Sequence, residues 1–136
     1  SADALAVAQT NVEQYGLQER IELIQSDLFS ALAGREYDLI ISNPPYVAFS
    51  EQSILSREVL SEPAIAVFAG EDKFPFVDLL LDRARTWLKP GGWLLMEHGY
   101  DQAPAVRDLL VAAGFVDVAS AQDLAGIERI SFGRHP

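Results

Sequence analysis

Apolar and polar positions recur along the chain with periods that predict both helices and strands. Leu5, Ala8 and Val12 lie at helical spacing, whereas residues 38–42, Asp-Leu-Ile-Ile-Ser, form the short apolar run of a buried strand. With Gly and Pro as breakers, the pattern predicts helices at 2–15, 29–33, 76–88 and 103–113, with helical pieces around 51–60. It predicts strands at 21–25, 37–42, 93–97, 116–121 and 129–133.

The order of these elements predicts the fold class. Strands and helices alternate through most of the chain, which is typical of a parallel sheet covered by helices on both faces. The last two strands are joined only by a loop at 123–127, so we expect them to form an antiparallel, hairpin-like end. We therefore expect an α/β fold in which residues 1–136 form one domain.

The most informative feature is the run Asn43, Pro44, Pro45 and Tyr46, which directly follows the predicted strand at 37–42. Two consecutive prolines fix φ and donate no backbone hydrogen bond. The residue before a proline is pushed away from helical geometry. The strand must therefore end in a rigid elbow at its carboxyl end, which is where open α/β sheets bind ligands.

This elbow is suited to holding a planar amide or an exocyclic amine. The side chain of Asn43 offers a carbonyl acceptor and an NH2 donor, and the carbonyl of Pro44 has no helix or ladder partner. Together they can accept two hydrogen bonds from a planar NH2 group, and Tyr46 can lie against the flat face of that group. The plainer interpretation is a strand-ending Pro-Pro turn without a ligand.

Here the chain resembles a known family. Asn-Pro-Pro-Tyr after such a strand is similar to the signature of S-adenosylmethionine-dependent methyltransferases that modify planar nitrogens. Further blocks follow in order: Gln-Ser-Asp-Leu-Phe at 25–29, Glu-Pro at 62–63, Lys-Pro-Gly-Gly-Trp-Leu-Leu at 89–95, Glu-His-Gly at 97–99, Ala-Gly-Phe at 113–115 and Asp-Leu-Ala-Gly at 123–126 with Arg129. The series resembles the protein-(glutamine-N5) methyltransferases of the HemK/PrmC family and covers nearly the whole chain.

The resemblance implies a Rossmann-like class I methyltransferase fold with sheet order 3-2-1-4-5-7-6, in which 21–25 is the third strand and 37–42 the fourth. It implies methylation of the side-chain amide nitrogen of the glutamine in the Gly-Gly-Gln motif of peptide chain release factors, with S-adenosyl-L-methionine as cofactor and a cytoplasmic location. No general base is obvious, and the proton is expected to leave to solvent.

The resemblance also assigns roles to residues of this chain. Asn43, Pro44 and Tyr46 would be catalytic, and together with Pro45 they would bind the substrate amide. Asp27, Leu28 and Asn43 would contact the cofactor, with Asp27 and Leu28 beside the adenine; the alternative for Asp27 is the N-cap of the turn at Phe29.

The family features with no counterpart in these 136 residues are also informative. The glycine-rich loop after the first strand, the acidic residue that grips the ribose and the N-terminal helical domain of the family are not found here. The run Ser-Ala-Asp-Ala-Leu at 1–5 resembles the family segment just after that acidic residue. We therefore expect a partial methyltransferase domain without its first two strands, inactive alone and weak in cofactor binding, whose strand at 21–25 is unpaired or paired abnormally.

Composition narrows the alternatives. The formal net charge is −10 and no Lys/Arg cluster occurs, which argues against nucleic acid as the direct substrate. An adenine-N6 nucleic-acid methyltransferase, which uses the same elbow, and a non-catalytic member of the fold remain the two rivals. The chain has no cysteine and only two isolated histidines, so no metal site is expected, and no apolar run approaches a membrane span.

Three further features have competing interpretations. His98 could act as a base, but a strand-end residue hydrogen-bonded in the sheet is the favoured interpretation. Glu62 and Pro63 could shape the substrate pocket or form a plain turn. Trp87 and Trp93 flank the Lys-Pro-Gly-Gly turn and are interpreted as core packing.

Overall fold

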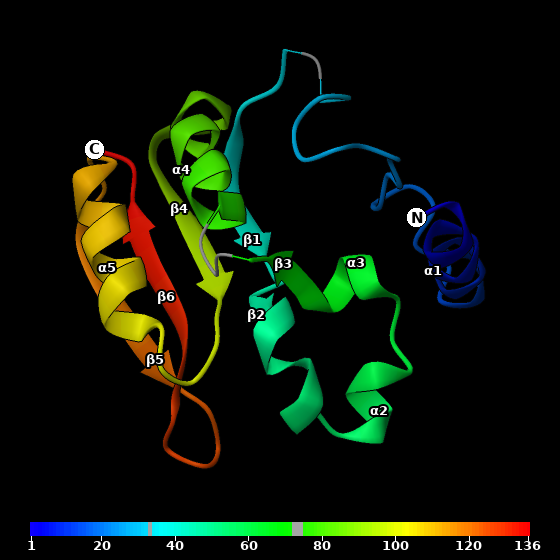
Figure 1. Ribbon diagram of the computed structural model, residues 1–136. Helices are drawn as coiled ribbons and strands as arrows, with labels where there is room; N and C mark the ends of the chain where they lie inside the picture. Colours follow the sequence, from blue (N-terminus) through cyan, green and yellow to red (C-terminus); the bar gives the residue numbers. More distant parts are fainter. Residues whose placement is uncertain (33, 72–74) are drawn as a thin grey trace. The chain divides into compact units, whose positions relative to one another are not determined.

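A computed structural model of the chain describes residues 1–32, 34–71 and 75–136 (Figure 1). Its contacts divide it into two compact units, Ser1–Arg35 and Glu36–Pro136. Each unit is described by itself below. No helix formed by the described residues is both long enough and apolar enough to cross a membrane.

The first unit begins with helix α1 (Ala2–Gln14), which confirms the helix predicted over 2–15. Gly16 ends it with a positive φ of 63°. The N–H of Gly16 donates to the carbonyl of Glu13 at 3.1 Å, and that of Leu17 donates to Val12 at 2.9 Å. This pair of bonds satisfies carbonyls at the helix end and favours a residue without a Cβ at position 16.

The rest of the first unit departs from the sequence prediction. Residues 21–26 form neither helix nor strand, so the strand predicted over 21–25 is wrong. A strand exists through its ladder bonds, and no described segment supplies them. The helix predicted over 29–33 is a hydrogen-bonded turn at 28–31, because a single turn rarely propagates, and position 33 lies outside the described residues.

The second unit is built on a four-stranded sheet with helices on one face (Figure 1). In spatial order the strands are β1 (Tyr37–Ser42), β4 (Leu88–Glu97), β6 (Glu128–Arg134) and β5 (Val116–Gln122). Strand β4 pairs in parallel with β1 and antiparallel with β6, which also pairs antiparallel with β5. This is the expected order of the fourth, fifth, seventh and sixth family strands, and the hairpin-like end is confirmed.

Helices α4 (Pro75–Trp87) and α5 (Ala103–Ala112) cover one face of this sheet. Leu94 and Met96 of β4 point to that face and are fully buried. Leu39 and Ile41 of β1 have the opposite phase and remain 47% and 70% exposed. The described helices of this unit therefore cover one face rather than the two that were expected.

Strand β4 begins five residues earlier than the predicted strand at 93–97. Leu88 pairs with Tyr37 and Trp93 with Leu39, so the residues between Leu88 and Trp93 bulge out of the ladder. A Cβ at Gly92 would lie 2.9 Å from the carbonyl oxygen of Lys89, which is too close for any other residue. The Lys-Pro-Gly-Gly turn is thus a bulge within the strand at the amino edge of the sheet.

Residues 47–70 form a small separate layer of short elements. Strands β2 (Val47–Ala48) and β3 (Phe68–Gly70) pair in parallel, a contact that was not predicted. The rings of Phe49 and Phe68 stack with centroids 5.1 Å apart, which joins the two ends of the segment. The predicted helical pieces are η1 (Phe49–Ile54) and α2 (Arg57–Leu60), followed by α3 (Ala64–Val67).

Candidate active site

The elbow lies where β1 ends, at the carboxyl edge of the sheet. Ser42, the last residue of β1, pairs with Met96 near the end of β4, so both strands deliver their following residues to this edge. The four residues after Ser42 are neither helix nor strand, as their two prolines require. Pro44 is buried and Asn43 is exposed.

Asn43 is available to a ligand. Its side-chain amide makes no hydrogen bond to any residue that the structure describes. An exposed amide on a backbone restrained by the buried Pro44 can therefore donate and accept without first breaking a contact within the described chain.

Tyr46 is held from two directions. Its hydroxyl donates to Glu97 Oε1 at 3.4 Å, and its main-chain oxygen accepts a hydrogen bond from Gln102 Nε2 at 3.1 Å. Burial raises the pKa of the Tyr46 phenol, the charge of Glu97 raises it further, and Arg129 opposes this shift. The phenol therefore stays a neutral donor, which makes it unsuited to act as a base at neutral pH.

Gln102 links the elbow to the end of β4 and was not found from the sequence. Its side chain is buried, with 4% of its surface exposed. Its Oε1 accepts the N–H of Gly99 at 2.8 Å while its Nε2 reaches Tyr46. The available signal was a Gln placed three residues after a strand-ending Gly and just before a helix.

A pocket of about 180 Å³ opens beside the elbow, bounded by Tyr46, Gly99, Gln102 and Arg129. Ile54 at the end of η1 and the following Leu55 provide an apolar wall, and Glu51 of η1 adds a carboxylate to the lining. This volume is small, of the size of an amino-acid side chain rather than of a whole cofactor. Glu62 and Pro63 do not line it; they form the turn between α2 and α3, as the plainer interpretation predicted.

Arg129 is fixed by the loop at 123–127, whose residues 123–126 also form one of the blocks of the family resemblance. Asp123 accepts the N–H groups of Ala125 and Ile127 at 2.8 and 3.0 Å, and Arg129 Nε donates to its second oxygen at 3.1 Å. The pKa of the Asp123 carboxyl is lowered, most of all by the hydrogen bond from the Ile127 N–H. The bonds from Arg129 and from the Ala125 N–H lower it further. The guanidinium is thereby oriented at the rim of the pocket.

His98 is a structural residue, as favoured from the sequence. It is 1% exposed. Its Nδ1 lies 2.9 Å from the Gly99 oxygen and its Nε2 lies 2.8 Å from Ser131 Oγ. Both ring nitrogens are therefore engaged. Trp93 packs edge-on against Phe132, with ring centroids 5.9 Å apart, but it is half-buried and does not belong to the buried core.

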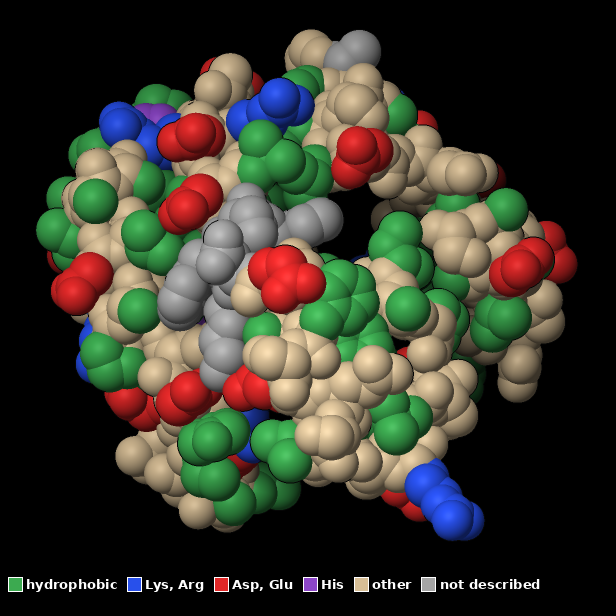
Figure 2. All heavy atoms as spheres, in the orientation of Figure 1, with side chains coloured by type: hydrophobic (Ala, Val, Ile, Leu, Met, Phe, Trp, Pro, Cys, Tyr) green, Lys and Arg blue, Asp and Glu red, His purple; other side chains and the backbone are tan. Residues whose placement is uncertain are grey.

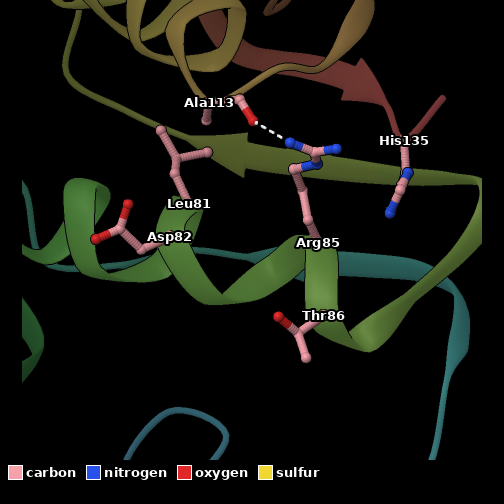
Figure 3. Close-up of a pocket in the computed structure, with 6 residues that line it drawn as sticks. All are labelled: Leu81, Asp82, Arg85, Thr86, Ala113 and His135. Carbon is pink, nitrogen blue, oxygen red and sulfur yellow. Dashed lines mark hydrogen bonds between the residues drawn. The ribbon is translucent and has the colours of Figure 1, made fainter.

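A larger hollow of about 410 Å³ lies at the opposite, amino edge of the sheet (Figure 3). Arg85 reaches from α4 toward α5 and donates from its guanidinium to the carbonyl of Ala113 at 3.0 Å. Ala113 ends α5, so this bond satisfies a free carbonyl at a helix C-terminus. The most prominent polar group of the hollow therefore serves the fold, and we place the candidate active site at the elbow.

The face seen in Figure 2 shows scattered acidic side chains, and its Lys and Arg side chains form no continuous stripe. Within the described residues, no group of three or more His, Asp or Glu side chains is arranged to hold a metal ion.

Comparison with known proteins shows that this chain is similar to methyltransferases. Residues 1–66 match the family model described as the methyltransferase small domain. Release factor glutamine methyltransferase of Xylella fastidiosa strain 9a5c is 41% identical over 136 residues, which is 100% of this chain and 49% of the relative. The enzymes of the same name from Pseudomonas aeruginosa and Escherichia coli K12 are 42% and 36% identical, over 97% and 98% of this chain and 48% of each relative.

The chain is homologous to the release factor glutamine methyltransferases along its whole length. It spans about half the length of the curated relatives it matches.

Solved structures establish the fold. A methyltransferase from Pyrococcus furiosus superposes with a TM-score of 0.71 at 18% identity, covering 98% of this chain and 58% of that one. The S-adenosylmethionine-dependent methyltransferase SibL gives 0.63 at 20% identity, covering 98% and 41%. The Rossmann-like methyltransferase fold expected from the sequence is therefore confirmed.

The two residues predicted to contact the cofactor adenine belong to the first unit. Leu28 adopts a positive φ of 49°, which is unfavourable for a residue with a Cβ and typical of sites where function requires strain. The carboxylate of Asp27 has no hydrogen-bond partner among the described residues. The capping role considered for Asp27 is met only by its backbone: its carbonyl accepts the N–H of Ser30 at 3.0 Å, while the side-chain bond to the turn comes from Ser26 Oγ, which accepts the N–H of Ala31 at 2.9 Å.

The structure thus brings Tyr46 together with Glu97, Gln102 and Arg129, and leaves Asn43 exposed beside them on the same elbow. The roles of these residues, and the meeting of Asp27 and Leu28 with the elbow around a cofactor, stay predictions.

Proposed function

We propose that this chain carries the amide-binding part of an S-adenosyl-L-methionine-dependent methyltransferase that modifies the glutamine of the Gly-Gly-Gln motif in peptide chain release factors. The elbow is the observation that carries the proposal. Its Asn43 amide is exposed and has no partner in the described chain, and the backbone of Tyr46, three residues later, is held by Gln102. Its homology to release factor glutamine methyltransferases supplies the substrate class.

The elbow addresses the chemical difficulty of the reaction. An amide nitrogen is a poor nucleophile because its lone pair is delocalised into the carbonyl. The side-chain oxygen of Asn43 and the main-chain oxygen of Pro44 would accept the two N–H bonds of the substrate amide. These bonds orient the nitrogen and raise its electron density, so that alignment supplies much of the rate enhancement.

Tyr46 would pack its ring on the substrate amide rather than exchange a proton with it. Its raised pKa keeps the phenol protonated. The face of a neutral aromatic ring attracts a nearby cation, and S-adenosyl-L-methionine, when bound, supplies a methyl group on a positively charged sulfur. The new C–N bond would form as the S–C bond of the bound cofactor breaks, and the amide proton would then leave to solvent.

The residues assigned to the cofactor have suitable chemistry for it. Asp27 offers a carboxylate that is not engaged by the described chain and can accept hydrogen bonds from an exocyclic amine. Leu28 offers an apolar side chain on a strained turn of the kind found at ligand sites. We extend the proposal to release factors as partners and to a cytoplasmic location.

The adenine-N6 alternative is not favoured. Its substrate carries a phosphate backbone, and a chain with a formal charge of −10 offers little attraction to it.

Mass spectrometry of a release factor after incubation with the full-length protein and S-adenosyl-L-methionine tests the proposal. We expect one added methyl group on the Gly-Gly-Gln glutamine. A release factor with Asn in place of that Gln is the matched control and should stay unmodified. Methylation of an adenine-containing oligonucleotide, with none on the release factor, would contradict the proposal.

A further inference from the structure

We propose that Gln102 is a positioning residue, which fixes the elbow in its working geometry through the main-chain carbonyl of Tyr46. The inference rests on the proposed function and goes beyond it, because Gln102 lies outside the Asn-Pro-Pro-Tyr run and is argued to act through the backbone of Tyr46. Its side chain is held in the interior, 4% exposed, between two segments far apart in the sequence.

The orientation of the Gln102 amide is determined by its partners. The N–H of Gly99 can only donate, so the side-chain oxygen must face it, at 2.8 Å. The carbonyl of Tyr46 can only accept, so the side-chain NH2 must face it, at 3.1 Å. Each end of the amide therefore has one suitable partner, and a flipped amide would lose both bonds.

A helix cap would be the ordinary role for a polar residue at this position. Gln102 immediately precedes α5, but its side chain accepts no hydrogen bond from the first turn of that helix. Its NH2 group instead reaches Tyr46, 56 residues earlier in the chain. The buried amide is thus committed to a tertiary contact with the elbow rather than to the start of α5.

The support behind Gln102 is itself rigid. Gly99 lets the amide approach closely, because a Cβ there would lie 3.1 Å from Gln102 Oε1 and 3.2 Å from its Cδ. The carbonyl of Gly99 is 2.9 Å from His98 Nδ1, and His98 Nε2 is 2.8 Å from Ser131 of the neighbouring strand β6. A continuous series of hydrogen bonds therefore connects the buried sheet to Tyr46.

The hydrogen bond from Gln102 to Tyr46 also restrains Asn43 and the Pro44 oxygen, because the two prolines between them make the elbow stiff. Pro44 and Pro45 have fixed φ angles, so a fixed carbonyl at Tyr46 limits where the Pro44 oxygen and the Asn43 side chain can lie. Without the anchor the elbow can shift as a unit. A displacement of about 1 Å is enough to lower an alignment-dependent rate about 100-fold.

The test uses three variants of the full-length protein. Gln102→Met keeps the length of the side chain and removes both hydrogen bonds. Gln102→Glu keeps the acceptor for Gly99 and removes the donor to Tyr46. Arg85→Met is the matched control, since it removes a bond to the Ala113 carbonyl at the other end of α5, away from the elbow.

We expect both Gln102 variants to lower kcat on a Gly-Gly-Gln peptide by about 10- to 100-fold, with little change in KM for S-adenosyl-L-methionine. Hydrogen–deuterium exchange at residues 46–48 should rise in both Gln102 variants. Arg85→Met should lower the melting temperature while leaving kcat and this exchange unchanged.

The outcomes separate the two proposals. Unchanged exchange at residues 46–48 in a folded Gln102→Met protein would overturn the positioning role, whatever the activity. An equal fall of kcat in all three variants, in proportion to lost stability, would also overturn it. Absence of methyl transfer by the unmodified protein would instead overturn the proposed function. If Gln102→Met fails to fold, Gln102→Glu provides the same comparison.

Discussion

The two edges of the sheet in Glu36–Pro136 differ in the use of their polar groups. At the amino edge the hollow is larger, about 410 Å³ against about 180 Å³ at the elbow. There, however, Arg85 serves a helix end, and Asp38 pairs with Lys89 at 2.8 Å. At the carboxyl edge, Asn43 has no partner in the described chain, while Tyr46 and Gln102 fix the backbone beside it.

Hydrogen-bonding groups that lie close together, some of them without a partner in the described chain, therefore mark the candidate site better than the volume of a hollow does. The sheet geometry explains why they converge at one edge. Strands β1 and β4 run in parallel, so the residues that follow them emerge side by side. At the other edge the same strands begin in a bulge and an exposed ion pair, which serve only the sheet.

Among variants at the two edges of the sheet, Asn43→Ala should cause the largest loss of kcat. Loss of one positioned hydrogen-bonding group in the transition state costs about 2–4 kcal/mol, which is about 10²–10³-fold in kcat. The fold should persist because Asn43 is exposed and makes no bond within the described chain. Methyl transfer to a Gly-Gly-Gln peptide and circular dichroism measure the two effects.

Asp38→Ala is the matched control for that variant, since it removes an exposed polar side chain at the other end of β1. It should leave kcat unchanged. Equal turnover by the Asn43→Ala and Asp38→Ala proteins would remove the distinction between the edges.

Tyr46→Phe should have a smaller effect. It removes the 3.4 Å hydrogen bond to Glu97 but retains the ring and the main-chain bond to Gln102. We expect a loss of about 0.5–1.5 kcal/mol, which is about 2- to 13-fold in kcat. Tyr46→Ala, which also removes the ring, should be markedly slower in the same assay. Equal rates for the two variants would exclude a role for the ring.

The contribution of the Tyr46 phenol to stability should depend on pH. Its folded-state pKa is raised, so the stability it contributes is complete below the pKa of the unfolded phenol and is lost as pH rises through the folded pKa. The stability of the unmodified protein relative to Tyr46→Phe should therefore be constant at neutral pH and decline in strong alkali. Denaturant unfolding across alkaline pH measures it, and a decline that begins near neutrality would contradict this environment.

Lys89→Met should have the smallest effect. Hydrogen bonding and the charge of Lys89 lower the pKa of Asp38, but both side chains are well exposed and such pairs contribute little to stability. Any contribution is present above the unfolded pKa of Asp38 and is lost as pH falls through its lowered folded value. NMR titration should show the pKa of Asp38 rising in the variant, with kcat unaffected; an unmoved pKa would contradict the ion pair.

What the sequence could predict follows from how local each feature is. The elbow depends on two prolines and their neighbours, and the β5–β6 hairpin depends on a short loop, so both were predicted correctly. The segment at 21–25 has the composition of a strand, but a strand requires a partner from elsewhere. The β2–β3 pairing joins two- and three-residue segments about 20 residues apart, which carry no period of their own.

Gln102 shows the same limit within the candidate site. Its importance comes from a contact with Tyr46 that no local pattern encodes, and the place of Arg129 at the rim of the pocket likewise follows only from the fold. Asn43 and Tyr46 could be singled out because the prolines between them impose a geometry that is readable from four residues. Residues that act by holding others in place become visible only in three dimensions.

The most direct test of the central claim is a structure of the full-length protein with the demethylated cofactor and a Gly-Gly-Gln peptide. The quantities to measure are the distances from the glutamine side-chain nitrogen to Asn43 Oδ1 and to the Pro44 oxygen. We predict that both lie within about 2.7–3.2 Å, the range of an N–H···O hydrogen bond. A glutamine bound elsewhere, or one whose nitrogen is beyond hydrogen-bonding distance of both oxygens, would contradict the account.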